Sequence, residues 1–383
     1  MTAAAGAVIE RVLAGAEAVP AGATLASIET PAAVVDLSRF AATLLRTADY
    51  CRGQGLGYRP HTKTHKAPVI GAAQLVAGAS GLTVATLREA EVMAGVSDDL
   101  LLAYPQVGDA KVARLVALAA KVPRLGVAFD SADALEAVAR VAAAAGTRVG
   151  VMVEWDAGMG RVGVQSPEEA VRLARLAAES RGLRYDGLMF YPGHIRDGGE
   201  AGRAALATVN QRLAGVLAAL AREGLAPAIV SGGSTPTLWQ SHTLAGLTEI
   251  RPGTTVFNDR TTALAGVCDW DACAYSILAT VVSTAVPGQA VIDAGSKALA
   301  KEELRGAGSG YGALLDRPSV VVSALSEEHG MLDLSGTDWR PRVGDRVQVV
   351  PNHVCVSVNL QERVWGAENE SLRCRWPVTA RGR

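Results

Sequence analysis

Side chains that could do chemistry are concentrated in one stretch, residues 58–66, which reads Tyr-Arg-Pro-His-Thr-Lys-Thr-His-Lys. The stretch contains three cationic side chains and two imidazoles, and its proline and threonines favour an extended chain over a helix. Two interpretations are open. One is a solvated basic turn. The other is a strand end that holds Lys63 among other cations, where a lysine loses its proton more readily and can form a Schiff base with an aldehyde.

Two further stretches combine glycines with hydroxyl groups, at residues 231–235 (Ser-Gly-Gly-Ser-Thr) and 251–255 (Arg-Pro-Gly-Thr-Thr). Either stretch alone is explained more simply as a tight turn. At the ends of two adjacent parallel strands, however, their backbone N–H groups could bind a phosphate. A phosphate site beside the amine of Lys63 is what pyridoxal 5′-phosphate requires, because its aldehyde bonds the amine.

An imidazole and a thiol lie two positions apart in the C-terminal third, at His353 and Cys355. If this segment is a strand, the two side chains face the same side and can converge on one ion. This donor pair suits Zn²⁺ better than Mn²⁺, and two protein ligands leave positions open for water or substrate. The simpler alternative is a buried cysteine beside a hydrogen-bonded histidine.

Apolar, strand-like segments alternate with amphipathic helices between residues 57 and 251. Near-continuous apolar runs indicate a parallel sheet covered on both faces, and the count of eight favours a closed (β/α)8 barrel of the TIM type. The first turn lacks the glycine-rich fingerprint of an open dinucleotide-binding sheet. The predicted strands are 57–64, 81–85, 100–104, 124–129, 148–154, 186–191, 228–231 and 247–251, and the main helices between them are 110–121, 132–145, 167–178 and 200–223.

Short β-type segments replace the long helices after residue 265, and a helix precedes the barrel. We therefore predict an antiparallel β domain made of residues 1–29 and 263–383, which carries the His353–Cys355 pair, joined to a barrel of residues 30–262. The predicted β segments are 276–282, 290–293, 320–323, 346–350, 354–358 and 364–365.

Chemistry in such a barrel lies at the carboxyl ends of the strands. Arg161 follows the predicted fifth strand, Tyr191 ends the sixth and Arg251 ends the eighth. Because a barrel closes on itself, Arg251 is expected near Lys63. No role is assigned to His194 or His61.

Composition narrows the classes of partner. The formal net charge is -1, with 49% apolar and 20% charged residues, so neither nucleic acid nor a membrane is expected as a partner. No apolar run looks long enough to span a bilayer, and the N-terminus lacks a signal-peptide layout. The five cysteines have no zinc-finger spacing, which fits a reducing cytoplasm.

Several of these motifs occur in an order that resembles the D-serine dehydratase/D-threonine aldolase family. Its members are metal-activated, alanine-racemase-like enzymes of fold type III that use pyridoxal phosphate. The resemblance extends from about residue 30 to the end of the chain. The segments that carry it are 59–66, 156–163, 231–235, 249–253, 293–297, 326–330 and 351–355.

The resemblance implies a role for each candidate residue. Lys63 is the Schiff-base lysine, with Lys66 as a neighbour that does not bond the cofactor, and His353 and Cys355 are the metal ligands. Arg161 and Tyr191 line the cofactor, and Arg251 matches the arginine that meets the pyridine nitrogen in alanine racemase. A homodimer is implied, and the residues expected around the phosphate are Gly232, Gly233, Ser234, Gly253 and Thr254.

The implied activity is elimination of water from a small 3-hydroxy-D-amino acid such as D-serine or 3-hydroxy-D-aspartate, giving a keto acid and ammonia. Cys355 favours elimination, because the aldolase branch resembles a His-x-Asp pattern at the positions where this sequence has His353 and Cys355. The alternative is retro-aldol cleavage of D-threonine-like substrates to glycine and an aldehyde. A racemase is less favoured, because Tyr275 and Tyr311, the C-terminal tyrosines, lie in no racemase-like motif. A non-catalytic pyridoxal-phosphate carrier would typically be a barrel alone.

Overall fold

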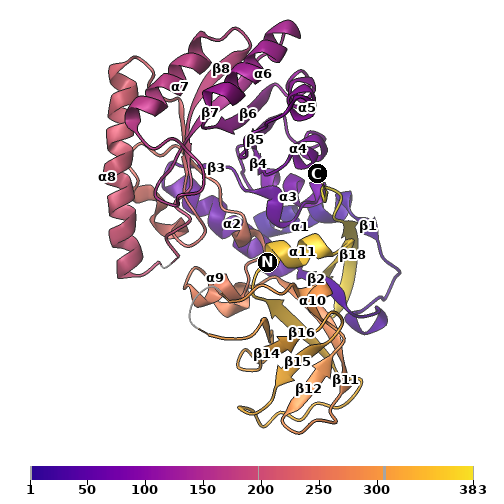
Figure 1. Ribbon diagram of the computed structural model, residues 1–383. Helices are drawn as coiled ribbons and strands as arrows, with labels where there is room; N and C mark the ends of the chain where they lie inside the picture. The colour runs from indigo at the N-terminus through magenta and orange to yellow at the C-terminus, as the bar shows by residue number, and fades with distance from the viewer. Residues whose placement is uncertain (1, 197, 305–307, 383) are drawn as a thin grey trace. The chain divides into compact units, whose positions relative to one another are not determined.

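The computed structural model describes residues 2–196, 198–304 and 308–382, and the chain forms two compact units (Figure 1). The β unit comprises Met1–Arg46, Thr64–Ala77 and Thr254–Thr379, and the barrel unit comprises Thr47–Lys63, Gly78–Gly253 and Ala380–Arg383. These divisions differ from the predicted boundaries of 30–262 and 263–383. Strand β2 (Ala32–Asp36) accounts for the difference at the N-terminal side, because it pairs with β11 and β17 of the β unit.

In the described part of the barrel unit, eight parallel strands form one sheet in the order β3-β10-β9-β8-β7-β6-β5-β4. Backbone contacts join its two edges: His61 bridges Thr83, and the Thr83 N–H donates to the Pro60 carbonyl at 2.9 Å. The predicted parallel barrel is therefore confirmed. The strands are β3 (Gly57–Tyr58), β4 (Leu82–Val84), β5 (Asp99–Leu102), β6 (Arg124–Phe129), β7 (Val149–Trp155), β8 (Leu183–Phe190), β9 (Ile229–Gly232) and β10 (Glu249–Ile250).

Side chains fill the barrel interior in layers, because successive residues of a strand point to opposite faces. One apolar layer contains a residue from each of four neighbouring strands: Leu101, Ala128, Met152 and Met189. Two positions further toward the carboxyl ends, three of these four residues are followed by a polar residue, and Leu101 is followed by Ala103. Glu154 follows Met152 in this way, and Tyr191 follows Met189.

Helices connect the barrel strands, and four of the five named below lie where helices were predicted (Figure 1). Ser166 caps α7 by accepting the Glu169 N–H at 3.2 Å, and Pro167 occupies the first turn. These helices are α4 (Leu87–Met93), α5 (Asp109–Ala119), α6 (Ala132–Ala144), α7 (Pro167–Glu179) and α8 (Glu200–Arg222).

Among the described helices, only α8 is long and apolar enough to cross a membrane, judged by length and composition alone. The prediction that no run reaches that length was therefore wrong. The buried residues of α8 recur every three or four positions, from Leu206 to Leu220, and the helix packs beside α7. This spacing is typical of a helix with one face against a protein core.

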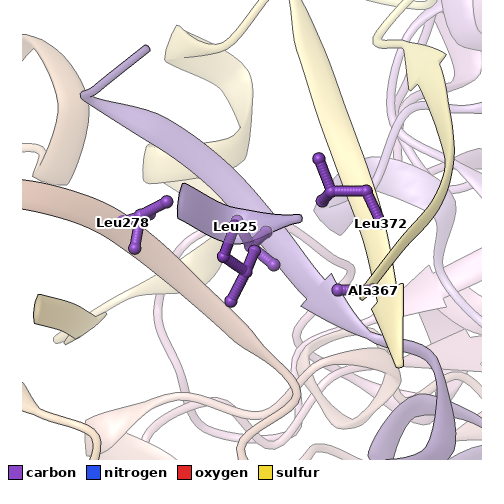
Figure 2. Packing of buried hydrophobic residues seen from close by; sticks show 5 residues of the cluster. Leu25, Leu278, Ala367 and Leu372 are labelled. Atoms are coloured by element: carbon purple, nitrogen blue, oxygen red, sulfur yellow. The ribbon is translucent and has the colours of Figure 1, made fainter. Parts of the chain in front are cut away.

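The β unit contains ten strands in its described residues, mostly antiparallel, in the order β1-β18-β17-β2-β11-β12-β15-β14, with β16 pairing β11 and β13. Leu25, Leu278 and Leu372 pack around β2 with two smaller residues of the same cluster (Figure 2). The strands are β1 (Glu17–Ala18), β2, β11 (Tyr275–Ser283), β12 (Gln289–Ile292), β13 (Gly312–Leu314), β14 (Val322–Leu325), β15 (Gly330–Asp333), β16 (Arg346–Pro351), β17 (Arg363–Glu368) and β18 (Ser371–Pro377).

Six further helices complete the described fold. The N-terminal helix α1 packs against α3, which follows β3 and precedes β4 in the chain. The division between the two units falls within α2. The six helices are α1 (Ala3–Gly15), α2 (Leu37–Gly53), α3 (Pro68–Val76), α9 (Arg260–Leu264), α10 (Ser296–Leu299) and α11 (Val354–Leu360).

Two predicted strands were wrong where chemistry was expected. The strand predicted at 57–64 is confined to β3, and Thr62–Thr64 form a 3-10 turn instead. The segment predicted as a strand at 354–358 is helix α11. Its alternating β-branched residues favour a strand locally, but Val354, Ser357 and Val358 bury one helical face and Asp259 accepts the Val354 N–H at 3.1 Å.

Candidate active site

The chain turns directly after β3, and Lys63 lies exposed in the 3-10 turn that follows. The turn is fixed by the Thr62 hydroxyl, which donates to the Thr83 carbonyl at 3.1 Å. The Lys63 ammonium makes no hydrogen bond or ion pair with any described residue. Both sequence interpretations were partly right, because the turn is solvated and it also presents a lysine at the carboxyl end of a barrel strand.

Two other members of the basic stretch are structural. His65 is buried and shares a hydrogen bond with the Gln74 side chain at 3.2 Å; burial lowers its pKa to about 4, so the imidazole is neutral. Arg59 is buried inside the barrel unit, where it donates to Glu249 at 2.8 Å and to Asp99 at 2.6 Å. These ion pairs link the segment after β3 to β10, its neighbour in the sheet, and to β5.

Replacing Glu249 by alanine is expected to destabilise the protein by about 3–5 kcal/mol, because it leaves the buried Arg59 without its main counter-charge. The matched control is Arg114→Ala, which breaks a more exposed pair with Glu91 and should cost at most about 1 kcal/mol. Urea unfolding followed by circular dichroism measures both free energies. Equal losses in the two variants would contradict a supporting role for the Arg59–Glu249 pair.

Arg251 lies buried just after β10, the strand next to β3. Its guanidinium donates to the Ser231 hydroxyl at 2.6 Å and to the Phe190 carbonyl at 2.8 Å, and Ser231 in turn donates to Glu249 at 2.6 Å. Burial lowers the pKa of Arg251 to about 10, although Glu249 and Glu154 oppose this change. The arginine therefore keeps its positive charge at neutral pH at the carboxyl end of the barrel.

The loop after β9 has the features of a phosphate site. Gly233 has a φ of 87°, which a residue with a side chain rarely adopts, and a Cβ on Gly232 would lie 2.3 Å from the Phe190 ring. The N–H groups of Gly233 and Ser234 donate no hydrogen bond to any described residue. Free N–H groups in a glycine loop fit the phosphate of pyridoxal phosphate. The Ser234 hydroxyl shares a hydrogen bond with Thr237 at 2.9 Å.

The second expected phosphate loop is divided between the units. Gly253 is buried at the end of the barrel unit, after Pro252, whose carbonyl accepts the His61 N–H at 3.0 Å. Thr254 begins a segment of the β unit, and its hydroxyl lies 4.0 Å from the Cys355 sulfur. Thr254 is thus found beside the thiol of the expected metal pair.

The loop after β7 carries Arg161. One carboxylate, that of Asp156, accepts the N–H groups of Gly158, Met159 and Gly160 at 3.0, 2.8 and 3.1 Å and fixes this loop. The Arg161 guanidinium lies 5.3 Å from the centre of the Tyr191 ring, so the structure brings together these two expected cofactor-lining residues. His194 is exposed in the loop that follows Tyr191.

Sequence reasoning missed Glu154, the penultimate residue of β7. Its residue exposure is 4%, and burial raises its pKa to about 7, against the opposing influence of Arg251 and Arg161. The available signal was an acidic residue at the end of an otherwise apolar strand. Such a position is unusual, because carboxylates are rarely buried without a partner.

In the β unit, His353 and Cys355 converge as predicted, although they do so at the start of α11 and not along a strand. Their side chains share a hydrogen bond. The Thr64 hydroxyl lies 3.1 Å from the Cys355 sulfur. Burial lowers the pKa of His353, but hydrogen bonds with Asp259 and Cys355 outweigh it and raise the pKa to about 10.

Asp259, also missed in the sequence, lies behind the histidine. Its carboxylate is 3.2 Å from His353 Nδ1, which leaves Nε2 for another partner. A carboxylate behind an imidazole is typical of metal-binding histidines. No group of three or more metal-binding side chains occurs among the described residues, so any ion here would have protein ligands from this pair and open positions besides. An imidazole and a thiol fit a divalent ion of the zinc type.

Asp259→Asn is expected to weaken metal binding by about 10- to 100-fold, because the amide cannot orient and polarise the imidazole as the carboxylate does. Titration of the metal-stripped protein measures the affinity. Asp259 also caps α9 by accepting the Thr262 N–H at 2.8 Å, so Ser166→Ala, which removes the cap of α7 in the barrel unit, serves as the control for a lost helix cap. An unchanged affinity in the asparagine variant would remove Asp259 from the metal site.

Comparisons with known proteins identify the family of the chain. The family model "Alanine racemase, N-terminal domain" matches residues 35–261, and the model "Putative serine dehydratase domain" matches residues 274–366. The chain is 32% identical to a D-threonine aldolase from Arthrobacter sp., over 94% of this chain and 95% of that protein. It is 33% identical to a D-threo-3-hydroxyaspartate dehydratase from Delftia sp., over 87% and 93%.

Solved structures give the same result. A crystal structure of D-threonine aldolase from Filomicrobium marinum is similar, with a TM-score of 0.87 and 32% identity over 96% of this chain and 98% of that one. A cysteine-to-alanine mutant of D-threo-3-hydroxyaspartate dehydratase in a metal-free form has a TM-score of 0.84 and 31% identity, over 93% and 99%.

Proposed function

Because the chain belongs to the D-serine dehydratase/D-threonine aldolase family of alanine-racemase-like, pyridoxal-phosphate-dependent lyases, we propose that it is a metal-dependent dehydratase of 3-hydroxy-D-amino acids. The products are a keto acid and ammonia. D-Serine and 3-hydroxy-D-aspartate are the proposed substrate types. The observation that carries the proposal is the convergence of His353 and Cys355 in front of Asp259.

Two threonines approach the thiol of the proposed metal pair. The Thr64 hydroxyl lies 3.1 Å from the Cys355 sulfur, and the Thr254 hydroxyl lies 4.0 Å from it. Thr64 directly follows Lys63 in the sequence.

Each residue has a proposed task. Gly233 and Ser234 would bind the cofactor phosphate through their N–H groups, and Lys63 would hold the cofactor and accept the substrate Cα proton. Bound pyridoxal phosphate withdraws electrons from Cα, which makes that proton acidic. His353 and Cys355 hold the ion, whose Lewis acidity favours departure of the β-hydroxyl group. Arg251 keeps a positive charge at the barrel end.

The proposal also covers the metal, the oligomeric state and the compartment. Zinc is proposed in preference to manganese, because a thiolate is a soft ligand. A homodimer in a reducing cytoplasm is proposed, and the five free cysteines, none of them in a disulfide, support the reducing compartment.

The alternative is retro-aldol cleavage to glycine and an aldehyde, which the similarity to a D-threonine aldolase favours. The test is to strip the purified protein of metal, add back Zn²⁺ or Mn²⁺, and supply D-serine, D-threonine or 3-hydroxy-D-aspartate. We expect keto acid and ammonia in equal amounts, lost on stripping and restored by zinc. Release of glycine and aldehyde from the same samples would overturn the dehydratase assignment.

A further inference from the structure

Glu154 is a buried acid that the proposed mechanism does not use. Its residue exposure is 4%, and its carboxylate makes no hydrogen bond with any described residue. Burying a carboxylate is costly unless something compensates its charge. Glu154 lies at the end of a barrel strand, where chemistry is expected. A buried carboxylate at such a position is expected to have a positively charged partner.

The strand register fixes the direction of the side chain. Met152, two residues earlier in β7, packs inside the barrel against Leu101, Ala128 and Met189. Since residues two apart on a strand share a face, Glu154 also faces the barrel axis, one layer nearer the carboxyl ends. In the parallel register Glu154 is paired with Met189 of β8, next to Phe190, whose carbonyl accepts the Arg251 guanidinium.

Two arginines supply the positive field around Glu154. Arg251 and Arg161 stabilise its ionised form, whereas Asp130 and Asp156 oppose it. The hydrogen bonds of the Arg251 guanidinium go to Ser231 and Phe190, and Arg161 lies over the Tyr191 ring. Neither arginine forms an ion pair with a described residue, and the buried acids Glu249 and Glu154 both favour the charged form of Arg251.

We propose that Glu154 is a positioning residue, whose negative charge holds Arg161 and Arg251 in place around the ring of pyridoxal phosphate. This inference rests on the proposed function only in requiring the cofactor to bind at the barrel mouth. Glu154 balances two guanidinium groups that would otherwise repel each other in a site of low dielectric constant. The role proposed for Glu154 does not involve the phosphate loop at Gly233 and Ser234.

The charge of Glu154 depends on pH near neutrality, since burial raises its pKa to about 7. The protonated form predominates below that pH and the ionised form above it. Activity and the visible absorption of the bound cofactor should therefore change with a midpoint near pH 7, with the productive form on the alkaline side. The charged groups that face Glu154 are Arg161, Arg251, Asp130 and Asp156.

The test is Glu154→Gln, which removes the charge and keeps the shape. The cofactor should bind no more weakly than in the wild type, because the site loses a negative charge and the cofactor phosphate is an anion. The absorption maximum should shift, the transition near pH 7 should disappear, and kcat should fall by about 10- to 100-fold with little change in KM. Glu154→Asp, which keeps the charge, should retain a transition with a moved midpoint.

Glu89→Gln is the matched control, because Glu89 is buried in the same unit and accepts the Ala85 N–H at 2.7 Å. It should leave the cofactor spectrum and its pH dependence unchanged. If Glu154→Gln binds cofactor with the wild-type spectrum and pH profile, the inference is wrong while the proposed function stands. If the wild-type protein itself binds no pyridoxal phosphate, both fail.

Discussion

Lys63→Ala is expected to lower turnover by at least about 10³-fold, because the proposed mechanism assigns two tasks to this amine. It bonds the cofactor, and it accepts a proton from Cα, a step for which a positioned base contributes about 10²–10⁴-fold. The variant should also lose the cofactor on dialysis. Borohydride reduction followed by peptide mass spectrometry should place the cofactor on Lys63 in the wild type and find none in the variant.

Lys66→Ala is the control for this experiment. Lys66 lies three residues further on, in the β unit, with a φ of 49°. Its replacement should leave the covalently attached cofactor in place. The assignment of Lys63 is refuted if Lys66→Ala loses the cofactor while Lys63→Ala retains it.

His353→Ala should reduce turnover by about 10²–10³-fold while leaving the cofactor bound. The imidazole is one of two protein ligands proposed for the ion, and Lewis-acid assistance is worth several kcal/mol, at about 1.4 kcal/mol per factor of ten. Metal content of the dialysed protein should fall in parallel, whereas the visible absorption of the cofactor should persist. Metal analysis, absorption spectroscopy and a keto-acid assay on one preparation measure all three.

His242→Ala is the matched control, because this exposed histidine of the barrel unit bonds the Tyr50 hydroxyl at 3.0 Å and belongs to no proposed site. It should retain metal, cofactor and activity. Unchanged turnover in His353→Ala, with metal lost, would show that the ion takes no part in the reaction.

The barrel was predictable because its strands are continuous apolar runs, and such runs occur at regular intervals between amphipathic helices. All eight predicted barrel strands overlap observed strands. The shortening of the first strand was not predictable in the same way. The turn at Thr62 depends on a hydrogen bond to Thr83, a partner that local propensity does not reveal.

Helix α11 is the clearest failure of local reasoning. Its sequence, Val-Cys-Val-Ser-Val-Asn-Leu, alternates β-branched and small residues and favours a strand. The helix is stabilised by distant partners: Asp259 accepts the Val354 N–H, and Ser357 donates to the Ala298 carbonyl at 2.8 Å. His353 and Cys355 converge at the start of this helix, whereas the prediction placed them on one face of a strand.

The residues of the candidate site that belong to local motifs could be predicted from the sequence. The residues that interact with charged groups distant in the sequence were missed. Lys63, Gly233 and Cys355 lie in short recognisable stretches. Glu154 and Asp259 act on residues far away in the sequence, namely Arg251 and His353. Such pairings depend on strand register and on tertiary packing, which periodicity alone does not encode.

The most direct test of the central claim asks which substrate bond breaks. D-Serine and 3-hydroxy-D-aspartate carrying deuterium at Cα would be supplied to the zinc-loaded protein, and the products analysed by mass spectrometry. Elimination breaks the Cα–H bond, so we predict slower turnover of the deuterated substrates and a keto acid formed with loss of the deuterium at Cα. Glycine that retains the deuterium, released together with an aldehyde, would contradict the account.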